Sequence, residues 1–160
     1  MSDTHETSTD IVVLNDDVPT MAVLPLRNTV VYPHMPNQLT AGRERSLKAL
    51  ETAAESGAPI AIFTQRRAEV EEPAFEDLYP IGTIAKIHRI WRLPDGSIRF
   101  IIQGLDRGRL LALESSEPFL LGRVRQLEDE GDESSTAVQG LMRSVNSQFQ
   151  AVIDLSAQLP

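Results

Sequence analysis

Residues 81–111 read IGTIAKIHRIWRLPDGSIRFIIQGLDRGRLL and predict the β-hairpin around which the fold is built. Two runs rich in isoleucine and aromatic residues, a composition typical of strands, flank the segment Pro94–Gly96. Proline presets φ at about −65°, aspartate bonds to nearby backbone and glycine tolerates positive φ. We therefore expect a type I turn with a left-handed glycine, which makes a three-residue hairpin connection.

Apolar side chains occupy both faces of the second strand of this hairpin. One face carries Ile98, Phe100 and Ile102. Ile101 and Leu105 share the opposite face, whereas a strand exposed on one side would alternate more strictly. We therefore expect a central strand pair of a small barrel, or of a sheet covered by a helix. Gly104 and Gly108 are the predicted bends or bulges of these strands.

Charge and composition narrow the class of protein. The 160 residues favour one domain with an appendage, and the absence of cysteine excludes disulfides. No apolar run approaches the roughly 20 residues that span a membrane, and the acidic N-terminus is not a secretory signal. The net charge of −8 is concentrated in residues 1–20 and 128–133. Because such segments are typical of tails and loops, we interpret residues 1–20 as a disordered acidic leader.

The segment between the leader and the hairpin alternates between strand and helix patterns. Met21–Leu26 predicts a strand, with Pro25 at an edge or a non-bonded position. The prolines of the following segment, Arg27–Pro36, predict a stiff, extended loop. Its large apolar side chains either pack onto the body of the domain, which we favour, or form a contact surface. Arg43–Glu55 has the periodicity of a helix with one apolar face. Further strands are predicted at residues 59–64, 107–114 and 119–127.

Residues 134–160 predict a long amphipathic helix. Ser134 or Ser135 can cap its first turn. The apolar residues at helical spacing are Val138, Leu141, Met142, Val145, Phe149, Val152 and Ile153. We expect this helix to begin a helical bundle that is truncated here, or alternatively to fold back on the barrel.

The sequence contains no recognisable catalytic, cofactor or metal motif. Its histidines, His5, His34 and His88, lack metal-ligand spacing. Neither a phosphate loop nor a nucleophile elbow is present. Basic residues between Lys86 and Arg125 suggest a nucleic-acid face, but the acidic domain lacks an aromatic nucleic-acid motif. We expect no catalysis, no cofactor and no metal in this chain, and no nucleic-acid partner.

Four segments together resemble the amino-terminal domain of bacterial Lon proteases. They are LPLRNTVVYPH at 24–34, GRERS at 42–46, LPDGS at 93–97 and GLDR at 104–107. The resemblance covers roughly residues 21–160 and does not include the leader. It implies an α+β fold: a small, mostly antiparallel PUA-like β-barrel with a packed helix in residues 21–127, followed by the C-terminal amphipathic helix at residues 134–160.

The resemblance also implies a function. The domain would recognise substrates and support assembly for an ATP-dependent serine protease that degrades misfolded, damaged and short-lived regulatory proteins. That protease would be a cytoplasmic homohexamer that uses ATP and Mg²⁺. Its ATPase module and Ser-Lys dyad have no counterpart in these residues. The alternative is a freestanding PUA-like module that binds a ligand or RNA.

The candidate contacts with substrate or a neighbouring subunit lie in three places. Gly42–Ser46 and the YPHMP loop come from the resemblance, and the hairpin tip adds exposed apolar residues. Methionine adapts to many partners. The two prolines stiffen the loop, so little conformational entropy would be lost when it contacts a partner. The predicted contact residues are Tyr32, Pro33, His34, Met35, Pro36, Arg43, Glu44, Arg45, Trp91 and Leu93.

Overall fold

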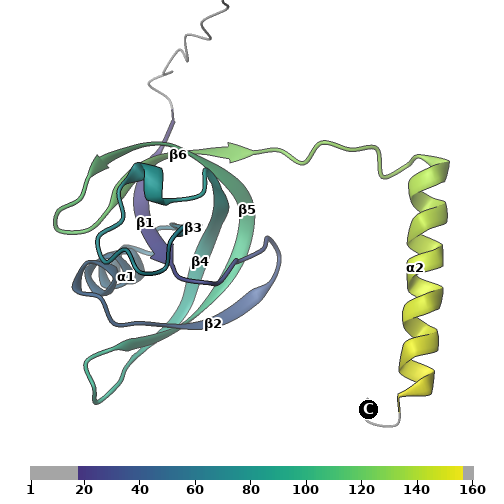
Figure 1. Cartoon of the computed structure of the whole chain (residues 1–160), viewed down its shortest axis with the longest axis horizontal. Helices are drawn as coiled ribbons and strands as arrows, with labels where there is room; N and C mark the ends of the chain where they lie inside the picture. Colours follow the sequence, from purple (N-terminus) through teal and green to yellow (C-terminus); the bar gives the residue numbers. More distant parts are fainter. Residues whose placement is uncertain (1–17, 157–160) are drawn as a thin grey trace, which may run out of the picture. The chain divides into compact units, whose positions relative to one another are not determined.

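The computed structural model describes residues 18–156, and the chain divides into two compact units between Glu128 and Asp129. Residues 1–17, most of the predicted leader, lie outside the described residues. The first unit contains β1 (Thr20–Leu26), β2 (Pro36–Ala41), α1 (Glu44–Ser56), β3 (Ile60–Thr64), the 3₁₀ helix η1 (Phe75–Asp77), β4 (Ile81–Arg92), β5 (Ile98–Ser115) and β6 (Leu121–Leu127) (Figure 1). The second unit contains α2 (Thr136–Leu155).

The six strands form one mixed sheet in the order β2-β5-β4-β3-β1-β6. β1 and β3 are parallel, and every other pair is antiparallel. Because the long β5 pairs with both β4 and β6, the strands β5-β4-β3-β1-β6 follow one another in a ring, and the sheet curls into an irregular, barrel-like form (Figure 1). The predicted α+β class and the mostly antiparallel, barrel-like sheet are confirmed.

The central hairpin has the predicted turn. Arg92 pairs with Ile98, and the Leu93 N–H donates to the Ser97 carbonyl at 2.8 Å. Gly96 adopts φ 85°, the left-handed conformation that glycine permits. The Asp95 carboxylate accepts hydrogen bonds from the Ser97 N–H at 2.9 Å and from its hydroxyl at 2.6 Å. The local bonding of the LPDGS segment therefore fixes the connection.

Two strand predictions were incomplete. β5 runs unbroken from Ile98 to Ser115, so the separate strand predicted at residues 107–114 is its second half. The strand bends rather than ends, because Leu105 is an extra residue between Gly104, which faces Ala85, and Asp106, which faces Ile84. The edge strand β2 was missed, since its sequence PNQLTA lacks the β-branched enrichment typical of strands.

The sheet buries apolar residues on both faces, as the hairpin pattern predicted. We call one the α1 face, because Leu50 and its helical neighbours pack there. The strand residues of this face include Leu24, Ile62, Ala85, Ile98, Phe100 and Ile102. We call the other the β6 face, because Val124 packs there. Its further members include Val23, Phe63, Ile84 and Leu110.

The helix predicted at residues 134–160 is α2. Ser135 caps it by accepting a hydrogen bond from the Val138 N–H at 3.2 Å. Its apolar face is exposed in the described unit: Leu141, Met142, Val145, Phe149 and Val152. That this unit begins a helical bundle stays a prediction. Within residues 18–156, no helix is long and apolar enough to cross a membrane.

Candidate functional site

The loop between β1 and β2 is held against the sheet by buried contacts. It crosses β4 and reaches β5 (Figure 1), with Val31 buried in the core on the α1 face. The buried Thr83 hydroxyl of β4 donates to the Val31 carbonyl at 2.6 Å. On β5, the Gly104 carbonyl accepts from the His34 N–H at 2.9 Å, and the Gly104 N–H donates to the Met35 carbonyl at 3.1 Å. The loop is therefore a fixed part of the fold.

Large apolar side chains of this loop nevertheless face solvent. Tyr32 is 62% exposed and Met35 is 54% exposed, and Val30 is exposed beside them. Pro33 is half-buried, whereas His34 and Pro36 are exposed. A stiff backbone with exposed apolar side chains loses little conformational entropy when it contacts a partner.

Two further residues extend this surface, and sequence reasoning missed both. The Thr64 hydroxyl donates to the Thr29 carbonyl at 2.6 Å, and the Thr64 carbonyl accepts from the Tyr79 N–H at 3.0 Å. Tyr79, which is 47% exposed, therefore lies beside the loop. Ile81 is two residues before Thr83 on the same strand and is also exposed. We call Val30, Tyr32, Met35, Tyr79 and Ile81 the apolar strip.

Trp91 and Leu93 lie elsewhere, so the structure does not join them to the loop. Trp91 pairs with Arg99. Arg99 is five residues before Gly104, the residue that bonds to the loop, so the two positions are about 17 Å apart along β5. Its neighbour Ile90 packs on the α1 face, so the Trp91 side chain points to the opposite face. There the Arg89 guanidinium lies 5.8 Å from the Trp91 ring centre. A separate contact at Trp91 and Leu93 stays a prediction.

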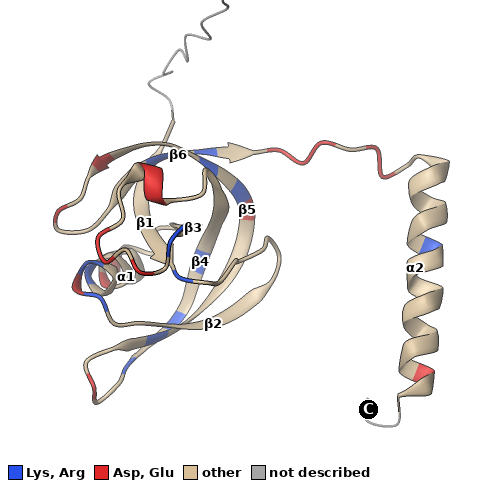
Figure 2. Ribbon diagram, viewed as in Figure 1, with Lys and Arg blue, Asp and Glu red and all other residues tan. Residues whose placement is uncertain are grey.

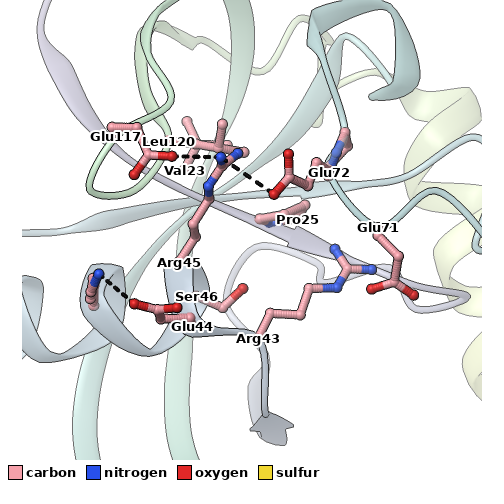
Figure 3. A pocket seen from close by; sticks show the side chains of 12 residues that line it. Val23, Pro25, Arg43, Glu44, Arg45, Ser46, Glu71, Glu72, Glu117 and Leu120 are labelled. Atoms are coloured by element: carbon pink, nitrogen blue, oxygen red, sulfur yellow. Dashed lines mark hydrogen bonds and ion pairs between the residues drawn. The ribbon is translucent and has the colours of Figure 1, made fainter.

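Arg43, Glu44 and Arg45 line an open cleft of about 370 Å³ at the start of α1 (Figure 3). Arg45 bridges two carboxylates, that of Glu72 at 3.4 Å and that of Glu117 at 2.6 Å. Glu44 pairs with Lys48 at 2.7 Å; this hydrogen bond lowers the pKa of Glu44 and raises that of Lys48. The charges of the cleft are therefore largely paired within the domain.

Arg43 ties the start of α1 to the β3–β4 connection. Its guanidinium donates to the Gln65 side-chain oxygen at 2.7 Å and to the Val70 carbonyl at 3.4 Å. Partial burial, and then the neighbouring Arg27, lowers its pKa. The geometry thus gives Arg43 a clear structural task, while contact with a partner stays a prediction. Within the described residues, no group of three or more histidine or acidic side chains could hold a metal ion.

Comparison with known proteins places this fold among domains of one protease. A family model described as the ATP-dependent protease La (LON) substrate-binding domain matches residues 20–160. The chain is 38% identical to the Lon protease of Escherichia coli K12 over 139 residues, which is 86% of this chain and 18% of that protein. It is 40% identical to the Lon protease of Heliobacterium modesticaldum over 140 residues, 88% of this chain and 17% of that protein. The chain therefore spans less than a fifth of the length of these relatives.

Two solved structures share the fold. One is the N-terminal domain of the Mycobacterium avium complex Lon protease, with a TM-score of 0.63 at 18% identity over 85% of this chain and 68% of that one. The other is a Lon N-terminal domain protein from Xanthomonas campestris, with a TM-score of 0.63 at 18% identity over 84% of this chain and 75% of that one. At this identity the likeness supports the fold alone.

Proposed function

The chain belongs to the family of LON substrate-binding domains, and from this premise we propose that it holds unfolded or damaged polypeptides for an ATP-dependent serine protease. The observation that carries the proposal is the apolar strip, in which Tyr32 and Met35 are more than half exposed on an anchored loop. Exposed apolar surface of this kind is typical of binding sites for apolar partners.

Weak, sequence-tolerant binding follows from this surface. Methionine adapts to different side chains, and tyrosine supplies a large contact area with few rotatable bonds. A small strip with few anchors favours dissociation constants of roughly micromolar or weaker, which permits release of the substrate to the next step. Because apolar contact is not screened by ions, this binding should persist at high salt.

We assign no chemical step to this chain. ATP hydrolysis with Mg²⁺ and peptide cleavage would take place in other parts of a full-length protease, where the ATPase module and Ser-Lys dyad reside. We propose a cytoplasmic homohexamer as the working assembly, with misfolded, damaged and short-lived regulatory proteins as its substrates. Support for these proposals comes from the family and from the named relatives.

The alternative, a freestanding PUA-like module for a ligand or RNA, is not favoured. One physical reason is that the basic residues between Lys86 and Arg125 are divided between the two sides of the sheet. Trp91 and Arg99 lie on the opposite face of the sheet from Arg109, because the extra residue Leu105 reverses the alternation of β5. A single nucleic-acid groove would need its cations together.

Titration of the chain with a fluorescent, permanently unfolded reporter polypeptide tests the proposal. The double variant Tyr32→Ser/Met35→Ser should weaken binding by about fivefold or more, as expected when interface anchors are removed. Trp91→Ser is the comparison variant: it removes an exposed aromatic ring from the opposite face, where a separate contact is predicted, and it should cost less affinity than the double variant. An unchanged affinity of the double variant, or an equal loss with Trp91→Ser, would refute the apolar strip as the substrate site.

A further inference from the structure

Two arginines lie directly opposite each other on neighbouring strands. Arg109 of β5 pairs with Arg125 of β6, and both side chains are exposed. Figure 2 shows lysine and arginine positions in blue on both strands. Like charges at such positions destabilise a sheet, since their Cβ atoms are only about 5 Å apart. Neither guanidinium forms an ion pair with any residue in the range 18–156. The pair thus concentrates positive charge that the described part of the fold does not neutralise.

This arginine pair borders the apolar strip. Arg109 also pairs with Ile81 of β4, which is itself a member of the strip. Thr83, which holds the Val31 carbonyl, is two residues further along β4, or about 7 Å away. Alternation places Ile81, Thr83 and Arg109 on the same side of the sheet, because Ile84 and Leu110 both point to the β6 face. A strand-like peptide of four or five residues could therefore reach from Tyr32 to Arg109.

We propose that Arg109 and Arg125 form a carboxylate-binding end of the substrate site. The inference rests on the proposed function, and it specifies the substrate: an unfolded segment in which an apolar or aromatic residue is followed within a few positions by an acidic residue. The apolar side chain lies on the strip, and the carboxylate accepts hydrogen bonds from the two guanidiniums. Arginine suits this task, because its planar fork of N–H donors matches the two oxygens of a carboxylate.

Charge distribution favours an acidic polypeptide over a nucleic acid. The exposed cations Lys86, Arg89 and Arg99 lie on the opposite side of the sheet from the arginine pair. A phosphate chain needs a track of many cations, whereas one or two carboxylates need only the pair. The apolar residues beside the pair match side chains of an unfolded polypeptide.

The experiment compares three labelled peptides that share one apolar and aromatic core. The flanking pair of residues is glutamate in the first, glutamine in the second and lysine in the third. At low salt the full chain should bind the glutamate peptide about three- to tenfold more tightly than the glutamine peptide, the range expected for exposed ion pairs. The lysine peptide should bind most weakly. Because surface charges are screened, high salt should abolish the difference between the three.

Variants separate this inference from the proposed function. Arg109→Gln/Arg125→Gln should remove the preference for glutamate and leave the affinity for the glutamine peptide unchanged. Lys86→Gln/Arg99→Gln removes the same charge from the opposite side and should preserve the preference. Tyr32→Ser/Met35→Ser should weaken the binding of all three peptides. Among these variants, only an unchanged affinity of this one would count against the proposed function.

Three results would overturn the arginine pair as a carboxylate site. The first is equal binding of the glutamate and glutamine peptides by the full chain. The second is an equal loss of preference in the Lys86→Gln/Arg99→Gln control, which would indicate a general effect of net charge. The third is displacement of the glutamate peptide by a single-stranded oligonucleotide that binds the chain more tightly than the peptide does. If the oligonucleotide also loses affinity for the Arg109→Gln/Arg125→Gln variant, the pair is a nucleic-acid site.

Discussion

Gly104 lies directly beneath the backbone of Tyr32: a Cβ atom added to the glycine would be 2.2 Å from the Tyr32 carbonyl oxygen. No side chain fits in that space, so glycine allows the loop to rest on β5. The resulting hydrogen bonds run from the His34 N–H to the Gly104 carbonyl and from the Gly104 N–H to the Met35 carbonyl. This contact links the central hairpin to the apolar strip.

Gly104→Ala should displace the loop and weaken binding of an unfolded reporter. We expect a loss of about 1–3 kcal/mol in the free energy of unfolding, as is typical of overpacked sites. Urea denaturation and reporter titration measure the two effects. Gly140→Ala is the control, because the added Cβ meets no atom within 4 Å apart from its chain neighbours and the backbone of its own helix. Reporter binding by Gly104→Ala at full strength would mean that the position of the loop is unimportant.

Thr83→Val should loosen the loop without changing the volume of the side chain. The substitution removes the donor of the buried hydrogen bond to the Val31 carbonyl, which costs about 1–3 kcal/mol of stability. Thr40→Val, at an exposed position of β2, should change stability by less than about 0.5 kcal/mol. Faster amide hydrogen exchange at His34 in Thr83→Val is the expected local signature, and unchanged exchange there would contradict it.

Phe100→Ala tests the core of the hairpin. Phe100 is fully buried on the α1 face, so its truncation should cost about 3–5 kcal/mol of unfolding free energy. Ile101→Ala, at a half-buried position on the other face, should cost clearly less. Urea midpoints of the two variants provide the comparison. Similar midpoints would show that the register of β5 is wrong.

Stability should fall in acid partly because of Asp77. The hydrogen bond from Arg67, followed by that from the Ala74 N–H, lowers the pKa of the Asp77 carboxyl. A carboxyl with a lowered pKa stabilises the folded state above its ordinary pKa of about 3.9, and this contribution is lost as the pH falls toward the folded value. Asp77→Asn should therefore flatten the decline of the urea midpoint below about pH 4. An identical decline in the variant and the parent chain would exclude this contribution.

The elements that the sequence predicts well are those determined by local pattern. The turn at Pro94–Gly96 and the alternation of Ile98 and Phe100 depend on neighbouring residues, and the structure confirms both. The amphipathic spacing after Ser135 likewise predicts α2. β2 was missed because its pairing with β5 comes from a partner about 60 residues away, which local propensity does not reveal.

The candidate site was predictable only in part. The prolines around Tyr32 and Met35 mark a stiff loop, but they do not decide whether its apolar side chains pack or face solvent; in the structure both residues are exposed. Tyr79 lies beside this loop because Thr64 forms hydrogen bonds both to the loop and to Tyr79, a tertiary contact that the sequence does not reveal. The extra residue Leu105 decides which side Arg109 faces, so counting positions along the chain would place it wrongly.

Site-specific photocrosslinking tests the central claim most directly. A photoreactive benzophenone residue is placed at position 32 in one variant and at position 91 in another, and each is irradiated with the unfolded reporter. Crosslinks should form from position 32, should persist at high salt and should be absent when a stably folded protein replaces the reporter. Position 91, on the opposite face, should give far fewer. Crosslinking from position 91 with none from position 32 would contradict the account.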